Sequence, residues 1–330
     1  MVGFIEKTAN FLNKYLTLFV ILITVIALIL PSLFIPMAKI KIGTLSLTSV
    51  LLSVIMFSTG MSIKANDVLE ILKKPKDVII GVLGKFMLMS LGAFVIAKLL
   101  GLNDQLAFGL IILGCMPSGT VSSVITLLAN GDLSLAVAIV MIGTLLAPLL
   151  TPALTYLLAG AWVNINFMSM FTNILIIVLI PIVLGMIVRG IFKEKCDAYK
   201  KVIALITIIS VLIIVGTSTA PNKNSILSMN SVIVIIAVVL NFAVAAGGSG
   251  LLAKALKMNR KKTIALVITT SEQNSALAVG IAGTFSAVYP AAVIPSIIAV
   301  SINVILATIV GNLLRVKENE SEAVKTVDIK

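Results

Sequence analysis

The sequence predicts an all-α integral membrane protein of about ten transmembrane helices. Hydrophobic residues make up 59% of its 330 residues and charged residues only 12%. In a soluble domain this balance would leave large apolar patches exposed to water. The polar runs between the apolar stretches are too short for a separate soluble domain, which needs roughly 50 residues or more.

The apolar residues fall into ten stretches, each long enough to cross about 30 Å of hydrocarbon. They are, in chain order, Leu16–Ile35, Leu45–Ile63, Val78–Leu100, Gln105–Leu128, Leu133–Leu158, Met168–Val188, Val202–Thr219, Ser231–Leu256, Thr263–Phe285 and Ala291–Leu314. The first stretch is too long for a typical signal-peptide core and has no small-residue cleavage pattern behind it. It is therefore expected to remain as the first helix.

Basic residues alternate between the connections of this scheme. The net charge is +12, and if the N-terminus is cytoplasmic, 20 of the 25 basic residues fall in inner segments and only Lys39, Lys41 and Lys223 in outer ones. Because positively charged loops stay inside, the sequence predicts a multi-pass protein of the cell (inner) membrane with both termini in the cytoplasm. Short basic clusters between apolar spans do not form the continuous basic face that nucleic acid needs, so the lipid bilayer is the expected partner.

Two of the expected helices are interrupted by polar residues at matching places. The fourth contains GCMPSGT over Gly114–Thr120, and the ninth contains TTSEQNS over Thr269–Ser275, about 155 residues later. Such runs are tolerated at bilayer depth where they are buried in protein or line a cavity. Each break lies in the fourth of five helices, and five is odd, so residues 1–160 and 161–330 are predicted to be inverted repeats. Paired broken helices in an inverted repeat indicate the substrate site of a transporter.

The second segment of each broken helix is expected to start after Ser118 and after Asn274. Its first backbone N–H groups carry partial positive charge, so an anion is the natural ligand. The predicted binding residues at these starts are Ser118, Gly119, Thr120, Asn274 and Ser275. The alternative is that Pro117 only kinks a helix and the polar residues satisfy the carbonyl groups it frees.

At these residues the sequence resembles the bile acid:sodium symporter family. The segments that carry the resemblance are KKPKDVIIGVLG (73–84), GCMPSGTVSSVITLLANGDLSLAVAIV (114–140), PLLTPA (148–153), PIVLG (181–185) and QNS (273–275). The resemblance implies a secondary transporter of small organic anions, such as bile salts or pantoate-like acids, working by alternating access. It implies a panel domain of helices one, two, six and seven beside a core domain of helices three to five and eight to ten.

By the same resemblance, Thr120 and Asn274 face the substrate and Asn303 on helix ten lies nearby. Each could instead be an ordinary hydrogen-bonding residue between helices, which is the commoner role of a lone polar residue in a span.

The sequence departs from this family at the two sodium sites. The positions that the resemblance assigns to sodium ligands hold Lys85, Ser122, Ser123, Ala136, Val140, Thr269 and Gln273. Only Ser122 and Gln273 keep the family's side chains. Sodium needs five or six oxygen ligands, and alanine, valine and lysine side chains supply none. The sequence therefore favours a carrier that does not depend on sodium.

Lys85 and Glu272 are opposite charges expected at similar depth, about 12 Å and about 15 Å from the cytoplasmic edge at 1.5 Å per residue. Because isolated charges there are costly, they are expected to pair or to share a hydrogen-bonded network with Gln273 and Ser123. One interpretation is a structural ion pair. The sharper hypothesis is that the Lys85 ammonium replaces the second sodium, leaving transport uncoupled or coupled to a proton on Glu272 or Lys85. Sodium held mainly by backbone carbonyl groups remains the alternative.

Other functional classes fit the sequence poorly. It has no histidine and two cysteines that lie at different depths, so no metal, haem or other cofactor site is expected. An intramembrane enzyme would need a nucleophile with a base or a pair of aspartates, and the spans contain no aspartate. A channel, the alternative of another class, would need a continuous polar path. Nothing in the sequence implies a protein partner.

Overall fold

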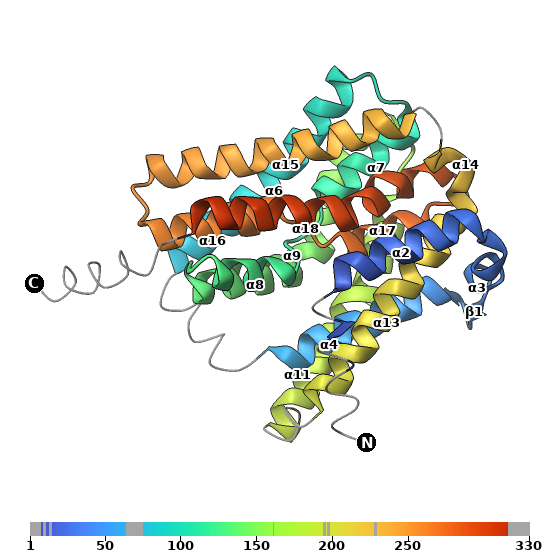
Figure 1. Cartoon of the computed structure of the whole chain (residues 1–330), viewed down its shortest axis with the longest axis horizontal. Helices are drawn as coiled ribbons and strands as arrows, with labels where there is room; N and C mark the ends of the chain where they lie inside the picture. Colours follow the sequence, from blue (N-terminus) through green and yellow to red (C-terminus); the bar gives the residue numbers. More distant parts are fainter. Residues whose placement is uncertain are drawn as a thin grey trace, which may run out of the picture.

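The computed structural model describes residues 15–63, 75–160, 162–193, 199–227 and 230–315, together with residues 8, 11, 12 and 196. Apart from one short hairpin, the regular elements in this part of the chain are helices (Figure 1). Six helical stretches are long and apolar enough to cross a membrane: Pro75–Leu99, Leu133–Ala159, Phe167–Phe192, Lys201–Asn222, Val232–Ala255 and Pro290–Leu314. The chain is therefore an all-α membrane protein, as predicted.

The first expected helix is shorter than predicted. Helix α2 spans Leu16–Ile29, and the predicted continuation to Ile35 is wrong because Pro31 and Pro36 lack the N–H group that a helix interior needs. The chain continues through η1 (Pro31–Leu33), α3 (Ile35–Ala38) and the antiparallel strands β1 (Lys41–Ile42) and β2 (Leu45–Ser46). Helix α4 (Leu47–Ser62) then begins at Ser46, whose side chain accepts a 3.2 Å hydrogen bond from the Ser49 N–H.

The remaining helices follow the expected stretches closely. They are α6 (Pro75–Leu99), α7 (Asp104–Gly114), α8 (Val121–Leu128), α9 (Leu133–Ala159), α10 (Phe167–Ile174), the π-helical η2 (Leu175–Leu179), α11 (Ile180–Phe192), α13 (Lys200–Thr219), η3 (Ala220–Asn222), α14 (Lys223–Ile226), α15 (Asn230–Ala255), α16 (Arg260–Ser271), α17 (Ser275–Thr284), η4 (Pro290–Val293) and α18 (Ile294–Leu314). The expected fourth helix is divided into α7 and α8, and the expected ninth into α16 and α17. Both interruptions fall inside the polar runs identified in the sequence.

The helices gather in two groups. Figure 1 shows α2, α4, α11 and α13 together at the lower right, while α6, α8, α9, α15, α16 and α18 lie toward the upper left and α7 lies above the centre. Helix α4 packs against α11 and α13, and α13 packs against α2. A Cβ atom at Gly60 would collide with the Ile182 carbonyl oxygen, and one at Gly185 would collide with that of Phe57. Small residues thus let the backbones of α4 and α11 touch, which is how helices associate in lipid.

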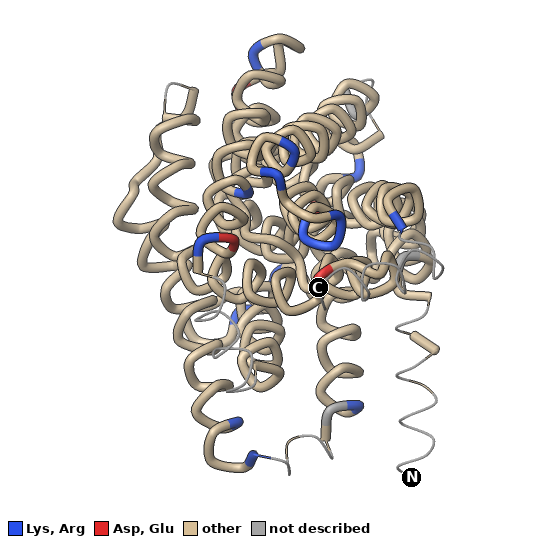
Figure 2. The backbone as a smooth tube through the Cα atoms, turned by 90° about the vertical axis from the view of Figure 1, so that its left-hand side faces the viewer, with Lys and Arg blue, Asp and Glu red and all other residues tan. Residues whose placement is uncertain are grey.

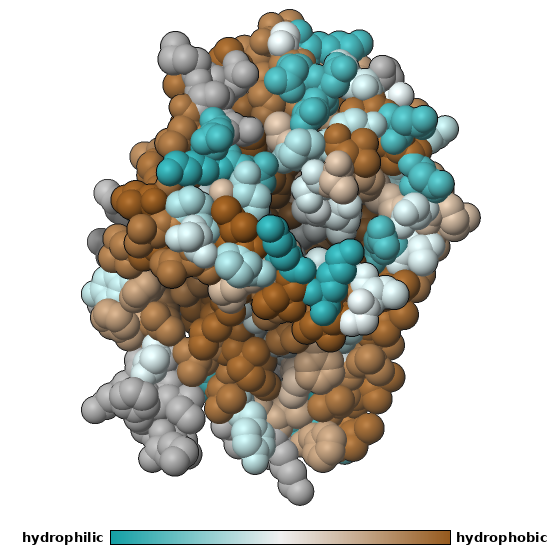
Figure 3. All heavy atoms as spheres, turned by 90° about the vertical axis from the view of Figure 1, so that its right-hand side faces the viewer, coloured by the Kyte–Doolittle hydropathy of each residue, from teal (hydrophilic) through white to brown (hydrophobic). Residues whose placement is uncertain are grey.

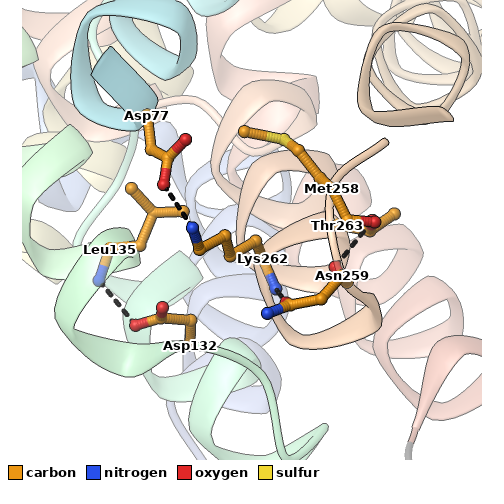
Figure 4. Close-up of polar contacts among 7 residues, drawn as sticks. All are labelled: Asp77, Asp132, Leu135, Met258, Asn259, Lys262 and Thr263. Atoms are coloured by element: carbon orange, nitrogen blue, oxygen red, sulfur yellow. Dashed lines mark hydrogen bonds and ion pairs between the residues drawn. The ribbon is translucent and has the colours of Figure 1, made fainter. Parts of the chain in front are cut away.

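Polar contacts lie at the first turns of α6, α9 and α16 (Figure 4). Asp77 of α6 and Lys262 of α16 form an ion pair of 2.7 Å. Asp132 caps α9 by accepting a 3.0 Å hydrogen bond from the Leu135 N–H, and Asn259 caps α16 by accepting one of 2.9 Å from the Lys262 N–H. These contacts fix the starts of three helices that meet at the helix breaks.

The two ends of the molecule carry different side chains. Figure 2 faces the end where α15 joins α16 and where five basic residues gather: Lys254, Lys257, Arg260, Lys261 and Lys262. Figure 3 faces the opposite end, where hydrophilic side chains lie among broad apolar areas. Nine basic residues of the predicted inner segments lie outside the described residues: Lys7, Lys14, Lys64, Lys73, Lys74, Lys195, Lys317, Lys325 and Lys330.

Candidate functional site at the two helix breaks

The two helix breaks lie directly against each other. Ser118 and Gln273 form an isolated antiparallel bridge, and the Asn274 N–H donates a 2.9 Å hydrogen bond to the Pro117 carbonyl oxygen. Each break leaves backbone groups without partners inside their own helices. Because unpaired backbone groups are costly away from water, each break supplies partners to the other.

Two hydroxyl groups complete the junction. Ser118 Oγ donates a 2.6 Å hydrogen bond to the Thr269 carbonyl oxygen, and Thr151 Oγ1 of α9 donates one of 2.7 Å to the Cys115 carbonyl oxygen. Thr151 was not among the predicted site residues. The sequence feature that could have indicated it is its position between two prolines in PLLTPA. A buried hydroxyl group near an interrupted helix can donate a hydrogen bond to a carbonyl group that the interruption leaves without a partner.

The predicted site residues separate into an open set and a buried set. Thr120 is exposed, and Asn274 and Ser123 are half-buried. The Thr120 side chain makes no capping hydrogen bond at the start of α8, whereas Asn274 Oδ1 accepts one of 3.0 Å from the Leu277 N–H and caps α17. The buried set consists of Lys85, Ser118, Gly119, Ser122, Thr269, Glu272, Gln273, Ser275 and Asn303.

Asn303 supports the second break from inside the protein. It is 1% exposed, and its Nδ2 donates to Gln273 Oε1 and, at 3.4 Å, to Ser275 Oγ. Gln273 Nε2 in turn lies 3.6 Å from the sulfur of Met89 on α6. The predicted place of Asn303 near the break is therefore observed, with its amide turned to the break and not to open space.

Lys85 reaches the second break from α6. Its side chain is 1% exposed, and its Nζ donates hydrogen bonds of 3.2 Å to the carbonyl oxygens of Thr270 and Glu272. Carbonyl groups at an interrupted helix point their negative ends outward and are suited to a cation. Here a tethered ammonium group occupies that position.

Glu272 does not form the direct ion pair predicted with Lys85. Within the part of the chain that the structure describes, no carboxylate lies within 4.0 Å of the Lys85 ammonium. The Glu272 side chain is 3% exposed and turns across the junction, so that a Cβ atom at Gly119 would collide with both carboxylate oxygens. The predicted network is also different, since the Gln273 amide bonds to Asn303 and Met89. Both side chains are nevertheless buried at the same junction, where opposite charges attract each other more strongly than in water.

The other positions assigned to sodium ligands are engaged locally or are apolar. Ser122 Oγ donates a 2.6 Å hydrogen bond to the Gly119 carbonyl oxygen, and Thr269 Oγ1 donates one of 2.7 Å within its own helix. Ala136 and Val140 are buried on α9. The described residues contain no group of three or more His, Cys, Asp or Glu side chains that could hold a metal ion.

Comparisons with known proteins agree with this fold. Residues 49–229, more than half of the chain, match the family described as "Sodium Bile acid symporter family". The chain is 34% identical over 278 residues to "Uncharacterized sodium-dependent transporter YocS" of Bacillus subtilis, a match that covers 84% of either chain. It is 30% identical to "Probable sodium/metabolite cotransporter BASS1, chloroplastic" of Arabidopsis thaliana, over 71% of this chain and 58% of the plant protein. It is 29% identical to human "Sodium/bile acid cotransporter 4", over 70% and 54%.

These relatives are transporters, and none of their names describes an enzyme or a channel. The family match and the YocS match each cover most of the segments in which the resemblance was noted, including the first helix break. The protein is a membrane transporter and not an enzyme, and its chain belongs to the sodium bile acid symporter family.

Proposed function

We propose that this protein is a secondary transporter of small organic anions, bile-acid-like or pantoate-like, that works by alternating access without sodium. The observation that carries the proposal is the Lys85 ammonium on the carbonyl oxygens of Thr270 and Glu272. A sodium ion at the break would need those oxygens as ligands. A tethered ammonium group satisfies them permanently and keeps the break ordered with no bound ion.

The proposed architecture is an inverted repeat of residues 1–160 and 161–330. Matching helix starts support it. Gly101, with φ of +60°, precedes Asn103, whose side chain caps α7; Lys257, with φ of +51°, precedes Asn259, whose side chain caps α16. The two turns share a left-handed residue and an asparagine cap at the same spacing, directly before the two broken helices.

A panel domain and a core domain fit the observed packing. The expected helices one, two, six and seven correspond to α2, α4, α10 with α11, and α13. Of these, α4 packs against α11 and α13, and α13 against α2, while the breaks lie among α6, α9, α16 and α18. Helix α17 contacts both α4 and α13, so the second break adjoins the boundary between the groups. The basic end shown in Figure 2 supports cytoplasmic termini and insertion in the cell membrane.

The open residues at the breaks fit an anionic substrate. Thr120 and Asn274 stand at the starts of α8 and α17, whose N-terminal ends carry partial positive charge. Within the described part of the chain, the Asn274 Nδ2 donates no hydrogen bond to protein. A carboxylate or sulfonate placed between the two starts would therefore meet donors and two helix dipoles.

Sodium coupling is the second candidate function, because the names of the relatives describe sodium-dependent transporters. In that case the ion would be held largely by backbone carbonyl oxygens. Nothing in the comparisons supports the channel alternative.

Uptake of radiolabelled taurocholate and pantoate into proteoliposomes tests the proposal, with choline and sodium buffers compared at one pH. We expect saturable uptake of at least one anion at equal rates in both buffers, and none in protein-free vesicles. An absolute requirement for sodium would establish the second candidate. Flux that does not saturate would contradict a carrier.

A further inference from the structure

The turn that joins α15 to α16 carries a dense basic cluster (Figure 2). Five of the nine residues 254–262 are lysine or arginine, and none is acidic. Lys262 is paired with Asp77. The other basic side chains of the turn are exposed, and within the described part of the chain they form no ion pair of 4.0 Å or less: Lys254, Lys257, Arg260 and Lys261. Four uncompensated positive charges therefore stand together at one end of the molecule.

The backbone of this turn does not require a charged residue. Lys257 has a φ of +51°, and the Met258 N–H donates a 2.9 Å hydrogen bond to the Ala253 carbonyl oxygen, five residues earlier. This is the common way to end a helix, and glycine is the usual left-handed residue in it, because a Cβ atom strains that conformation. Met258 packs against the buried cluster that includes Ala253, which holds the turn in place. The lysine thus adds a charge where glycine would form the turn with less strain.

An exposed apolar face of α15 runs into the basic cluster. The residues of this face follow one another at spacings of three or four and so share one side of the helix: Leu240, Val244, Gly247, Leu251 and Lys254. Leu240 is 41% exposed, and Leu251 is 71% exposed. A Cβ atom at Gly247 would meet no atom within 4 Å, so the face is open there. The membrane-spanning stretch ends at Ala255, which puts the basic turn at the membrane surface.

We propose that the turn between α15 and α16 binds the phosphate headgroup of an anionic phospholipid, whose acyl chains lie along the exposed face of α15. Phosphate oxygens accept hydrogen bonds from ammonium groups, and the Arg260 guanidinium can bind two of them at once. The first N–H groups of α16 add partial positive charge in the same turn. Clustered basic residues directly beside a membrane span attract anionic lipids. The site concerns the surrounding lipid and is independent of the transported solute and of the coupling ion.

The occupant is a lipid because the charges and the apolar face are continuous. A free phosphate compound would use the basic turn alone, whereas a phospholipid uses both the turn and the hydrocarbon-facing side of α15. The Lys254 side chain, at the end of that face, can lie on apolar surface while its ammonium group reaches the headgroup. The shape and the charge of this region thus match the two parts of one molecule.

A lipid bound here holds the start of the second broken helix. Helix α16 begins in the turn and ends at the break. Its start is already fixed to α6 by the ion pair of Asp77 with Lys262, and to the start of α9 by a 3.0 Å hydrogen bond from the Asp132 N–H to the Lys261 carbonyl oxygen. The headgroup adds a link between the end of α15 and the start of α16, so the bound lipid raises the thermal unfolding temperature.

Quenching of tryptophan fluorescence by brominated lipids in reconstituted vesicles tests the proposal. Trp162 is the one tryptophan of the chain, so the probe protein carries Trp162→Phe with Leu256→Trp, at a 46% exposed position in the turn. Brominated phosphatidylglycerol is compared with brominated phosphatidylcholine, each diluted in the unbrominated form of the other lipid. We expect the phosphatidylglycerol to bind at least tenfold more tightly.

Two variants of the turn separate lipid binding from structure. Lys257→Gly should lower the preference for phosphatidylglycerol by about fivefold. Its unfolding temperature in neutral detergent should be unchanged or raised, since glycine relieves the left-handed backbone. Adding Lys254→Gln should remove most of the remaining preference. The control Lys39→Gln with Lys41→Gln removes two exposed charges on α3 and β1, at the other side of Figure 1, and should keep it.

Equal binding of the two brominated lipids overturns the proposal. An equal loss of preference in the turn variants and in the control shows general attraction to basic residues, and overturns it as well. Displacement of the lipid by millimolar glycerol phosphate would show a site for free phosphate compounds and contradict a lipid site. Native mass spectrometry of the unmodified protein gives a second measurement. Phosphatidylglycerol should remain bound where phosphatidylcholine does not, and retention of neither lipid contradicts the proposal.

Discussion

Ser118 and Gln273, about 155 residues apart in the sequence, pair in a single antiparallel bridge where the two broken helices meet. The residue before Ser118 accepts a hydrogen bond from the residue after Gln273, and the residue after Ser118 donates one to the residue before Gln273. An antiparallel bridge has a local twofold axis. The inverted repeat proposed above would place a twofold axis of this kind between Ser118 and Gln273.

Asn274 combines two roles that substitution can separate. Asn274→Asp keeps an oxygen to accept the Leu277 N–H but replaces the free donor with a negative charge, so anion affinity should fall at least tenfold, which is about 1.4 kcal/mol. Thr120→Val should weaken binding more mildly.

The control Asn259→Ala removes the cap of α16 and should lower stability by about 1 kcal/mol without changing affinity. Calorimetric titration with the transported anion measures this, and unchanged affinity in both site variants would exclude the site.

The contact of α4 with α11 gives a prediction about stability. Gly185→Ala places a methyl group against the Phe57 carbonyl oxygen, so the helices must separate, and thermal unfolding in detergent should occur at a clearly lower temperature. Gly190→Ala, on the same helix, meets no atom within 4 Å and should leave the unfolding temperature unchanged or slightly raised. Equal effects from the two variants would mean that the close approach of α4 and α11 is not needed.

Much of the fold could be predicted because lipid imposes strong rules on sequence. Apolar length located the helices to within a few residues, and polar runs at bilayer depth located both breaks. The end of α2 was predicted wrongly because the stretch remains apolar beyond it. Average hydropathy does not indicate that Pro31 lacks the N–H group needed to continue the helix.

Less of the site could be predicted. The sequence indicated that Lys85 and Glu272 lie at one level, and the structure brings both to the break. It could not show that Lys85 would prefer backbone carbonyl groups, because these exist as acceptors only where α16 ends. The role of Thr151 was likewise hidden, since it depends on a carbonyl group of another helix.

The charges of Lys85 and Glu272 should be energetically coupled, although the ammonium bonds to the Glu272 carbonyl oxygen and not to its carboxylate. Lys85→Gln leaves Glu272 without a compensating charge, and we expect a loss of about 3 to 5 kcal/mol in unfolding free energy. Glu272→Met should destabilise similarly, because it leaves the Lys85 ammonium uncompensated. The double variant should recover much of the loss. Thermal or denaturant unfolding of the four proteins measures the coupling, and strictly additive losses would show that the two charges act independently.

Equilibrium binding of radiolabelled sodium to the purified, unmodified protein tests most directly whether the Lys85 ammonium has replaced the ion. YocS provides the comparison protein, since its name describes a sodium-dependent transporter. Because the ammonium already occupies the carbonyl oxygens of Thr270 and Glu272, we predict no saturable binding that excess unlabelled sodium displaces, with or without the transported anion. Saturable, displaceable sodium binding that grows when the anion is added would contradict the account.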